Sequence, residues 1–192
     1  MFINYVALML LNLVAGLVIL TGYVWELDRT ERRRWVPALG VVGFVLAASG
    51  LHMIWNWPLP GSHNMAFGEV SVLLGVLWLG TALAERQGWD LMPFTIYGAF
   101  SGLAAMVVGL RIIDLGMTRS PVLSGVGFIL TGLAGVLSVP GYQLRNKREV
   151  RLAGVLLLAA AALLWSVVAY GAYWSHVADY ANWVPATLRA VP

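Results

Sequence analysis

Six long apolar stretches alternate with five short polar segments along the chain. Each stretch has close to the ~20 residues that cross the ~30 Å hydrocarbon core of a bilayer. The pattern therefore predicts an all-α polytopic membrane protein with six transmembrane helices. The expected spans are about 2–25, 36–57, 65–85, 91–113, 121–142 and 152–175. We expect them to form one transmembrane domain over residues 1–178, followed by an interfacial tail over residues 179–192.

The composition supports a membrane location and excludes several other classes of protein. Of all residues, 60% are hydrophobic and 11% are charged, whereas soluble domains carry about 25% charged residues. The chain has no cysteine, which excludes a disulfide framework and a thiolate metal site. No nucleophile elbow or catalytic triad motif is present, so we expect no enzyme, and we expect no cofactor.

Basic residues are concentrated in three of the five polar segments. These nine residues are Arg29, Arg32, Arg33, Arg34, Arg86, Arg145, Lys147, Arg148 and Arg151. The positive-inside rule places these segments in the cytoplasm and both termini outside. The chain carries a net charge of +3, but the basic residues form no continuous helix face, so we expect no nucleic-acid partner.

A short motif recurs along the chain and suggests an internal repeat. Residues 15–23 (AGLVILTGY) and 134–142 (AGVLSVPGY) share the pattern A-G-x5-G-Y, and each leads into a basic segment. Gly16, Gly75 and Gly135 are 59 and 60 residues apart. This spacing predicts three helical hairpins, each closed by a basic turn. Because small residues let helices approach closely in lipid, we expect contact seams at Gly98 with Gly102, Gly125 with Gly127, and Gly132 with Gly135.

Ionisable residues in or beside apolar spans are costly and mark candidate functional sites. Glu69 begins the third span, where the helix dipole favours an acid; alternatively, it lies at the mouth of a pathway and pairs with Arg111 or a histidine. Arg111 and Asp114 are three residues apart on one helix face, so we expect a self-neutralising pair. His52 and Asn64 complete this candidate outer vestibule.

All three histidines lie on the outer side of the predicted bundle. His52 and His176 map to the outer ends of their helices, and His63 lies in the outer loop between the second and third spans. Together with Glu69 they could bind a metal ion or haem. No pair shows the spacing of neighbouring ligands, so unlinked interface histidines that titrate between about pH 5 and 8 are the simpler interpretation. At the opposite ends of the spans, we expect Glu26 and Glu85 to be ordinary interface charges.

Residues 73–100 (LLGVLWLGTALAERQGWDLMPFTIYGAF) resemble the bacterial urea/amide channel family. The positions that match without a gap are Leu73, Gly75, Trp78, Leu79, Gly88, Asp90, Pro93, Tyr97 and Phe100. The resemblance implies a six-helix protomer, a homo-oligomeric ring (a hexamer in the urea channels) and a solute pathway through each protomer. The fifth span departs from that family because it has no tryptophan. Residues 57–69 (WPLPGSHNMAFGE) look instead like the signature of a separate, uncharacterised prokaryotic membrane-protein family.

The leading hypothesis is a passive channel or facilitator in a prokaryotic cytoplasmic membrane. Its solute would be small and polar, such as urea, an amide or a short carboxylic acid. Trp78, Tyr97 and Phe100 would narrow the pathway. Trp165, like Trp78, lies within a span and either faces lipid or narrows a pore. Two alternatives are a non-transporting membrane subunit or scaffold, and an outer-leaflet metal- or haem-binding protein.

Overall fold

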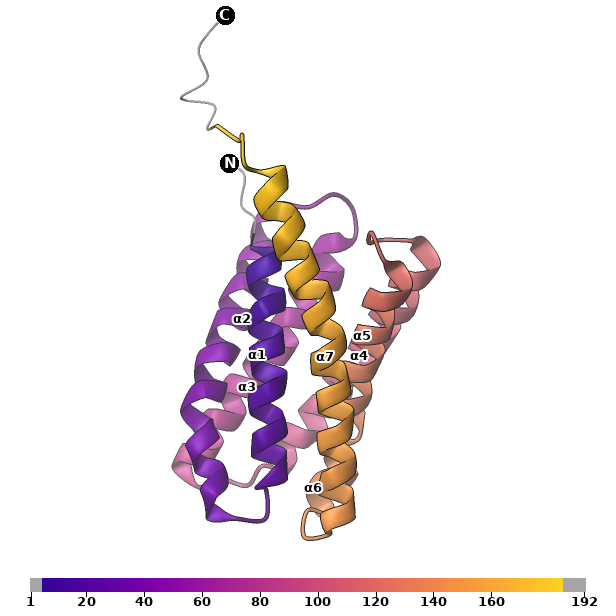
Figure 1. The fold of residues 1–192 in the computed structure, drawn as a ribbon. Coiled ribbons are helices and arrows are strands. Elements are labelled where there is room, and N and C mark those ends of the chain that lie inside the picture. Colours follow the sequence, from indigo (N-terminus) through magenta and orange to yellow (C-terminus); the bar gives the residue numbers. More distant parts are fainter. Residues whose placement is uncertain (1–4, 185–192) are drawn as a thin grey trace, which may run out of the picture.

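The computed structural model describes residues 5–184, which form a bundle of helices lying side by side (Figure 1). Its elements in chain order are α1 (Val6–Trp25), η1 (Thr30–Trp35), α2 (Val36–Asn56), η2 (Asn64–Glu69), α3 (Val70–Gln87), α4 (Met92–Leu115), α5 (Pro121–Val136), α6 (Ser138–Gln143) and α7 (Arg148–Asp179). The short η1 is a 3₁₀-helix and η2 is a π-helix. The expected all-α architecture is confirmed.

Five segments are long and apolar enough to cross a membrane. They are Val6–Trp25, Thr30–Asn56, Asn64–Gln87, Met92–Leu115 and Arg148–Asp179. The protein is therefore a multi-pass membrane protein by the hydropathy of its helices. The last of these helices is roughly 48 Å long and exceeds the hydrocarbon core. The predicted tail lies largely outside the described residues, because the description ends at residue 184.

The predicted fifth span, 121–142, is divided into two helices. The 16 residues of α5 end at Val136, and α6 begins at Ser138. Pro140 explains the break, because proline has no N–H to donate to the carbonyl of Val136 and its ring crowds that carbonyl. Residues 121–142 therefore do not form one continuous membrane-spanning helix, and the described residues contain five long helices instead of the six that the sequence predicts.

The two ends of the bundle differ in chemistry. We call the end formed by residues 26–35, 86–91 and 143–151 the basic end, because the nine basic residues of the three predicted segments lie there. We call the end formed by residues 57–63 and 116–120 the histidine end. The first and last described residues also lie at the histidine end (Figure 1).

Helix pairing differs from the predicted hairpins. The most extensive contacts join α4 with α5, α2 with α3, and α1 with α7. The loops that connect α4 with α5 and α2 with α3 lie at the histidine end, and α1 and α7 are the first and last long helices of the chain. The predicted hairpins, in contrast, are closed by loops at the basic end. The contacts across the basic turns, α1 with α2 and α3 with α4, are less extensive.

Glycines explain this pairing. In α2, in the continuous η2–α3 segment, in α4 and in α5, two glycines stand seven residues apart and so share one face of the helix. These pairs are Gly43 and Gly50, η2/α3 Gly68 and Gly75, Gly102 and Gly109, and Gly125 and Gly132. A Cβ built on Gly50 would lie 2.7 Å from the carbonyl oxygen of Gly68, and one on Gly109 would lie 2.7 Å from that of Gly125. Of the glycines expected in contact seams, Gly102, Gly125, Gly132 and Gly135 meet the backbone of the facing helix, whereas Gly98 and Gly127 face side chains.

Gly109→Ala is expected to destabilise the protein by about 1–3 kcal/mol, because its Cβ meets backbone that cannot rotate away. The control is Gly171→Ala in α7, where a Cβ meets nothing within 4 Å and the change should be neutral or stabilise by about 0.5–1 kcal/mol. Unfolding of the detergent-solubilised variants, followed by circular dichroism, measures both. Equal stability of the two variants would contradict the close-packing interpretation.

Candidate functional site

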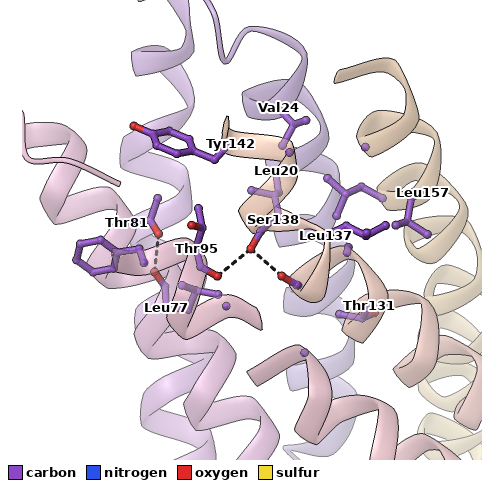
Figure 2. A pocket seen from close by; sticks show the side chains of 18 of the residues that line it. Leu20, Val24, Leu77, Thr81, Thr95, Thr131, Leu137, Ser138, Tyr142 and Leu157 are labelled. Carbon is purple, nitrogen blue, oxygen red and sulfur yellow. Dashed lines mark hydrogen bonds between the residues drawn. The ribbon is translucent and has the colours of Figure 1, made fainter. Parts of the chain in front are cut away.

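A cavity of about 440 Å³ lies among α1, α3, α4, α5, α6 and α7 and extends from Val70 and Ala105 to Tyr142 and Arg151 at the basic end. Figure 2 shows part of its lining. Its wall is mainly aliphatic and includes Leu20, Val24, Leu77 and Leu157. The volume is within the range of about 300–1,000 Å³ that small-molecule sites occupy. The cavity is therefore large enough to hold a small solute or part of a larger ligand.

Hydroxyl groups interrupt this apolar wall. Thr81 donates to the carbonyl oxygen of Leu77 at 2.8 Å, and Thr95 donates to that of Met92 at 2.7 Å. Ser138 has carbonyl oxygens of Gly135 and Thr95 at 2.6 and 3.0 Å, and Figure 2 shows it between two helices. Because these hydroxyl protons face backbone carbonyls, the oxygens retain lone pairs that can accept a hydrogen bond from a ligand.

A second cavity of about 50 Å³ lies nearer the histidine end. It shares four lining residues with the larger cavity: Val70, Leu74, Ala105 and Thr131. The larger cavity reaches Tyr142 and Arg151 at the basic end, whereas the smaller one reaches Val6 and Phe67. The two cavities thus follow one another along the bundle.

Three aromatic rings line the smaller cavity. The ring centroids of Phe67 and Phe128 are 6.1 Å apart, and those of Phe128 and Trp165 are 5.3 Å apart in an edge-to-face arrangement. The indole N–H of Trp165 donates to the hydroxyl of Thr131 at 3.0 Å, which fixes the ring. Trp165 therefore faces the bundle interior, one of the two orientations that the sequence left open. The sequence does not reveal that Phe67 and Phe128 face a cavity, because phenylalanine is also common on lipid-facing helix surfaces.

The predicted constriction residues occupy different environments. Trp78 is 2% exposed, lines the larger cavity and covers Gly16 of α1. Tyr97 is 38% exposed and Phe100 is 71% exposed, and neither lines either cavity. The structure therefore separates Trp78 from the other two, whose role in narrowing a pathway stays a prediction.

The predicted outer vestibule is also only partly assembled. Arg111 and Asp114 form the expected ion pair, and both side chains are exposed. Glu69 is exposed, and no ion pair among the described residues includes it. The exposed His52 contacts Tyr5 edge to face, with ring centroids 5.3 Å apart.

Asn64 is fully buried and holds the loop at the histidine end. Its side-chain oxygen accepts from the backbone N–H of Leu59 at 3.0 Å, and its amide nitrogen donates to the carbonyl oxygen of Leu59. His63 lies beside it, with its two ring nitrogens each 2.8 Å from a carbonyl oxygen, those of Pro60 and Met117. His63 therefore links the α2–α3 loop to the α4–α5 loop, and Asn64 holds that loop at the start of η2.

The three histidines make separate contacts. His52 lies against Tyr5, His63 against the two loops, and His176 near Tyr180, with ring centroids 6.1 Å apart. Within the described residues, no group of three or more histidines, aspartates and glutamates is placed to hold a metal ion. The metal-binding alternative thus finds no supporting cluster in this part of the chain.

Buried carboxylates at the basic end are not the ordinary interface charges that the sequence suggests. Glu85 is 4% exposed and accepts hydrogen bonds from the Tyr23 hydroxyl at 2.6 Å and from Arg32 Nε at 2.8 Å. Glu26 accepts from Trp35 Nε1 at 2.8 Å and pairs with Arg34. This network ties α1, η1 and α3 together beside the larger cavity, which Tyr23 lines.

Arg151 is the one arginine that lines the larger cavity among the described residues. It is 7% exposed, and its Nη2 lies 2.9 Å from Asp28 Oδ2. Its Nη1 donates to the carbonyl oxygen of Arg145 at 2.6 Å, while its buried Nε has no hydrogen-bond partner. The sequence places Arg151 in a basic segment but has no signal that predicts its burial.

The helices and their cavity define a polytopic helical membrane protein. The chain belongs to the DUF981 family, described as a protein of unknown function, whose family model matches residues 1–179. No curated protein and no solved structure matches the chain. Membership of an uncharacterised family agrees with the interpretation of residues 57–69, whereas these comparisons provide no link to the urea/amide channels.

Asn64→Ala is expected to lower the free energy of unfolding by about 1–3 kcal/mol, because it leaves buried backbone groups of Leu59 unpaired. Asn56→Ala is the control, since Asn56 is exposed and donates to a carbonyl of its own helix. Denaturant titration in detergent compares the two variants. If Asn64→Ala lowered the free energy of unfolding no more than Asn56→Ala does, the structural role of Asn64 would be contradicted.

Proposed function

We propose that this protein is a passive facilitator for a small, uncharged polar solute. The observation that carries the proposal is the pair of cavities that follow one another along the bundle and share Val70, Leu74, Ala105 and Thr131 in their walls. A solute that enters from the basic end passes the larger cavity first and then meets the aromatic rings of Phe67, Phe128 and Trp165. These rings act as the narrow part of the path.

The wall chemistry favours a solute that donates hydrogen bonds. The hydroxyls of Thr81, Thr95 and Ser138 offer acceptor lone pairs, because their protons face backbone carbonyls. Urea and small amides carry N–H donors that match these acceptors. A short carboxylic acid in its protonated form has one O–H donor, so it fits the same wall less well.

The same wall disfavours ions. Its one basic residue among those described, Arg151, already pairs with Asp28, and the remaining wall is aliphatic, aromatic or hydroxyl-bearing. Moving a bare charge into such surroundings costs several kcal/mol or more. The pathway that we propose therefore passes neutral molecules and excludes hydrated ions.

The membrane arrangement follows from the charges. The basic end lies in the cytoplasm of a prokaryotic cell and both termini lie outside, as the positive-inside rule requires. In this arrangement α5 and α6 together complete a sixth crossing. Glu69 and the Arg111–Asp114 pair lie at the outer mouth, and exposed apolar rings such as Phe100 face lipid or a neighbouring protomer of a homo-oligomeric ring.

Proteoliposomes that contain the protein are expected to take up acetamide and urea faster than empty liposomes, as measured by stopped-flow light scattering. Phe128→Leu should raise the uptake rate further, because it replaces an aromatic ring at the proposed narrow part with a smaller aliphatic side chain. Phe100→Leu is the matched control and should behave as the wild type, since Phe100 lines neither cavity.

Two outcomes count against this assignment. Equal rates with and without protein across the solute panel would remove the facilitator function. A larger effect of Phe100→Leu than of Phe128→Leu would instead support the constriction that the sequence predicts at Trp78, Tyr97 and Phe100.

A further inference from the structure

We propose that the larger cavity also binds a single-chain anionic amphiphile from the leaflet at the basic end. Its charged head would lie at Arg145 and Arg151, and its hydrocarbon chain would fill the cavity. This inference goes beyond the facilitator function and concerns binding alone, so it holds or fails independently of transport.

The cavity is at least as deep as one leaflet. On α1 and the turn after it the lining residues run from Leu17 to Leu27, and on α7 they begin at Val150 and Arg151 in the first turn. On α3 and α4 the lining extends further from the basic end, to Val70 and Ala105. Ten residues of helix correspond to about 15 Å, which is about half the ~30 Å thickness of the hydrocarbon core. The chain of a lipid whose head lies at the basic end would therefore reach no further than the cavity does.

The wall suits a hydrocarbon chain. Most lining side chains are aliphatic or aromatic, including Leu20, Val24, Leu77 and Leu157 (Figure 2). The hydroxyls of Thr81 and Thr95 direct their protons at carbonyls of their own helix. A hydrocarbon chain would thus leave none of these hydroxyl protons without an acceptor.

Two arginines at the mouth provide the charge for a head group. Arg151 is more than nine-tenths buried and lines the cavity. Its Nη2 pairs with Asp28 and its Nη1 donates to the Arg145 carbonyl oxygen, whereas its Nε has no partner. Buried donors are almost always hydrogen-bonded, so an unused donor at this position indicates a missing acceptor. An oxygen of a carboxylate or phosphate is the acceptor that an arginine binds most strongly.

Arg145 supplies the second positive charge. Its guanidinium carbon lies 4.3 Å from the ring centroid of Tyr142, a lining residue, and its Nη1 donates to the Tyr142 carbonyl oxygen at 2.9 Å. No ion pair among the described residues includes Arg145, whereas Glu26, Asp28 and Glu85 each have an arginine partner.

The charge balance at this end favours an anion as well. The nine basic residues there face six acids, which are Glu26, Asp28, Glu31, Glu85, Asp90 and Glu149. Asp90, the acid that the Tyr142 hydroxyl contacts at 3.2 Å, forms no ion pair among the described residues. The excess of positive charge attracts an anionic head, and the cavity beside it accommodates the attached chain.

The test is equilibrium binding of radiolabelled dodecanoate to the full-length protein in a neutral sterol-based detergent, whose rigid tail does not imitate the probe. We expect saturable binding of one dodecanoate per protomer and at least ten-fold weaker binding of dodecanol, which has the same chain without the charge. Equal binding of the two probes would overturn the role of the head group.

Matched variants separate the head from the chain. Arg145→Gln should weaken dodecanoate at least ten-fold, whereas Arg148→Gln, an exposed neighbour outside the cavity, should bind as the wild type. Leu157→Trp should weaken dodecanoate binding at least ten-fold by placing a bulky ring in the path of the chain, whereas Leu156→Trp, on an exposed face, should not. Each variant is first shown to be monodisperse and helical.

Failure of the two proposals is distinguishable. Dodecanoate binding that ignores both Arg145→Gln and Leu157→Trp would overturn the amphiphile site, whatever the liposome rates are. Flux no faster than in empty liposomes, together with variant-sensitive dodecanoate binding, would remove the facilitator function and leave the amphiphile site standing. Where both hold, dodecanoate should slow solute uptake, because chain and solute would occupy the same cavity.

Discussion

The close approach of glycine-lined helices is the constraint on which the remainder of this structure depends. Lipid offers no hydrophobic force between helices, so backbone-to-backbone packing of small residues supplies much of the association. Gly50 against Gly68 and Gly109 against Gly125 bring α2 to α3 and α4 to α5 nearly to backbone contact. Two tightly joined pairs follow, and α7 contacts both α1 and α5.

The cavity is a consequence of that arrangement. Glycine seams draw helices together within a pair, while contacts between α3 and α4 are few. The space that remains is closed at one side by Trp78, whose ring occupies the position left by the missing side chain of Gly16. Glycine thus acts in two ways here, by allowing backbone contact and by making room for a large ring that forms part of the cavity wall.

Each end of the bundle is held by a different chemistry. At the histidine end, Asn64 satisfies the backbone of its own loop and His63 connects two loops. At the basic end, arginines pair with Glu26, Asp28 and Glu85, two of which are buried. Buried carboxylates require such partners, because an unpaired charge in this position is strongly destabilising. The basic segments therefore serve packing as well as orientation.

The sequence by itself determined the class of protein, the approximate bounds of the apolar helices, the segregation of charge and part of the glycine seam between α4 and α5. These properties are local. The hydropathy of a segment depends on its own residues alone, and proline and glycine affect the backbone of the helix turn in which they stand. Only the tertiary structure decided that α2 pairs with α3, that Phe128 and Trp165 face inward while Phe100 faces outward, and that Glu85 and Arg151 are buried. The physical reason is that these helices are apolar on nearly every side, so their periodicity does not specify which face meets a neighbour.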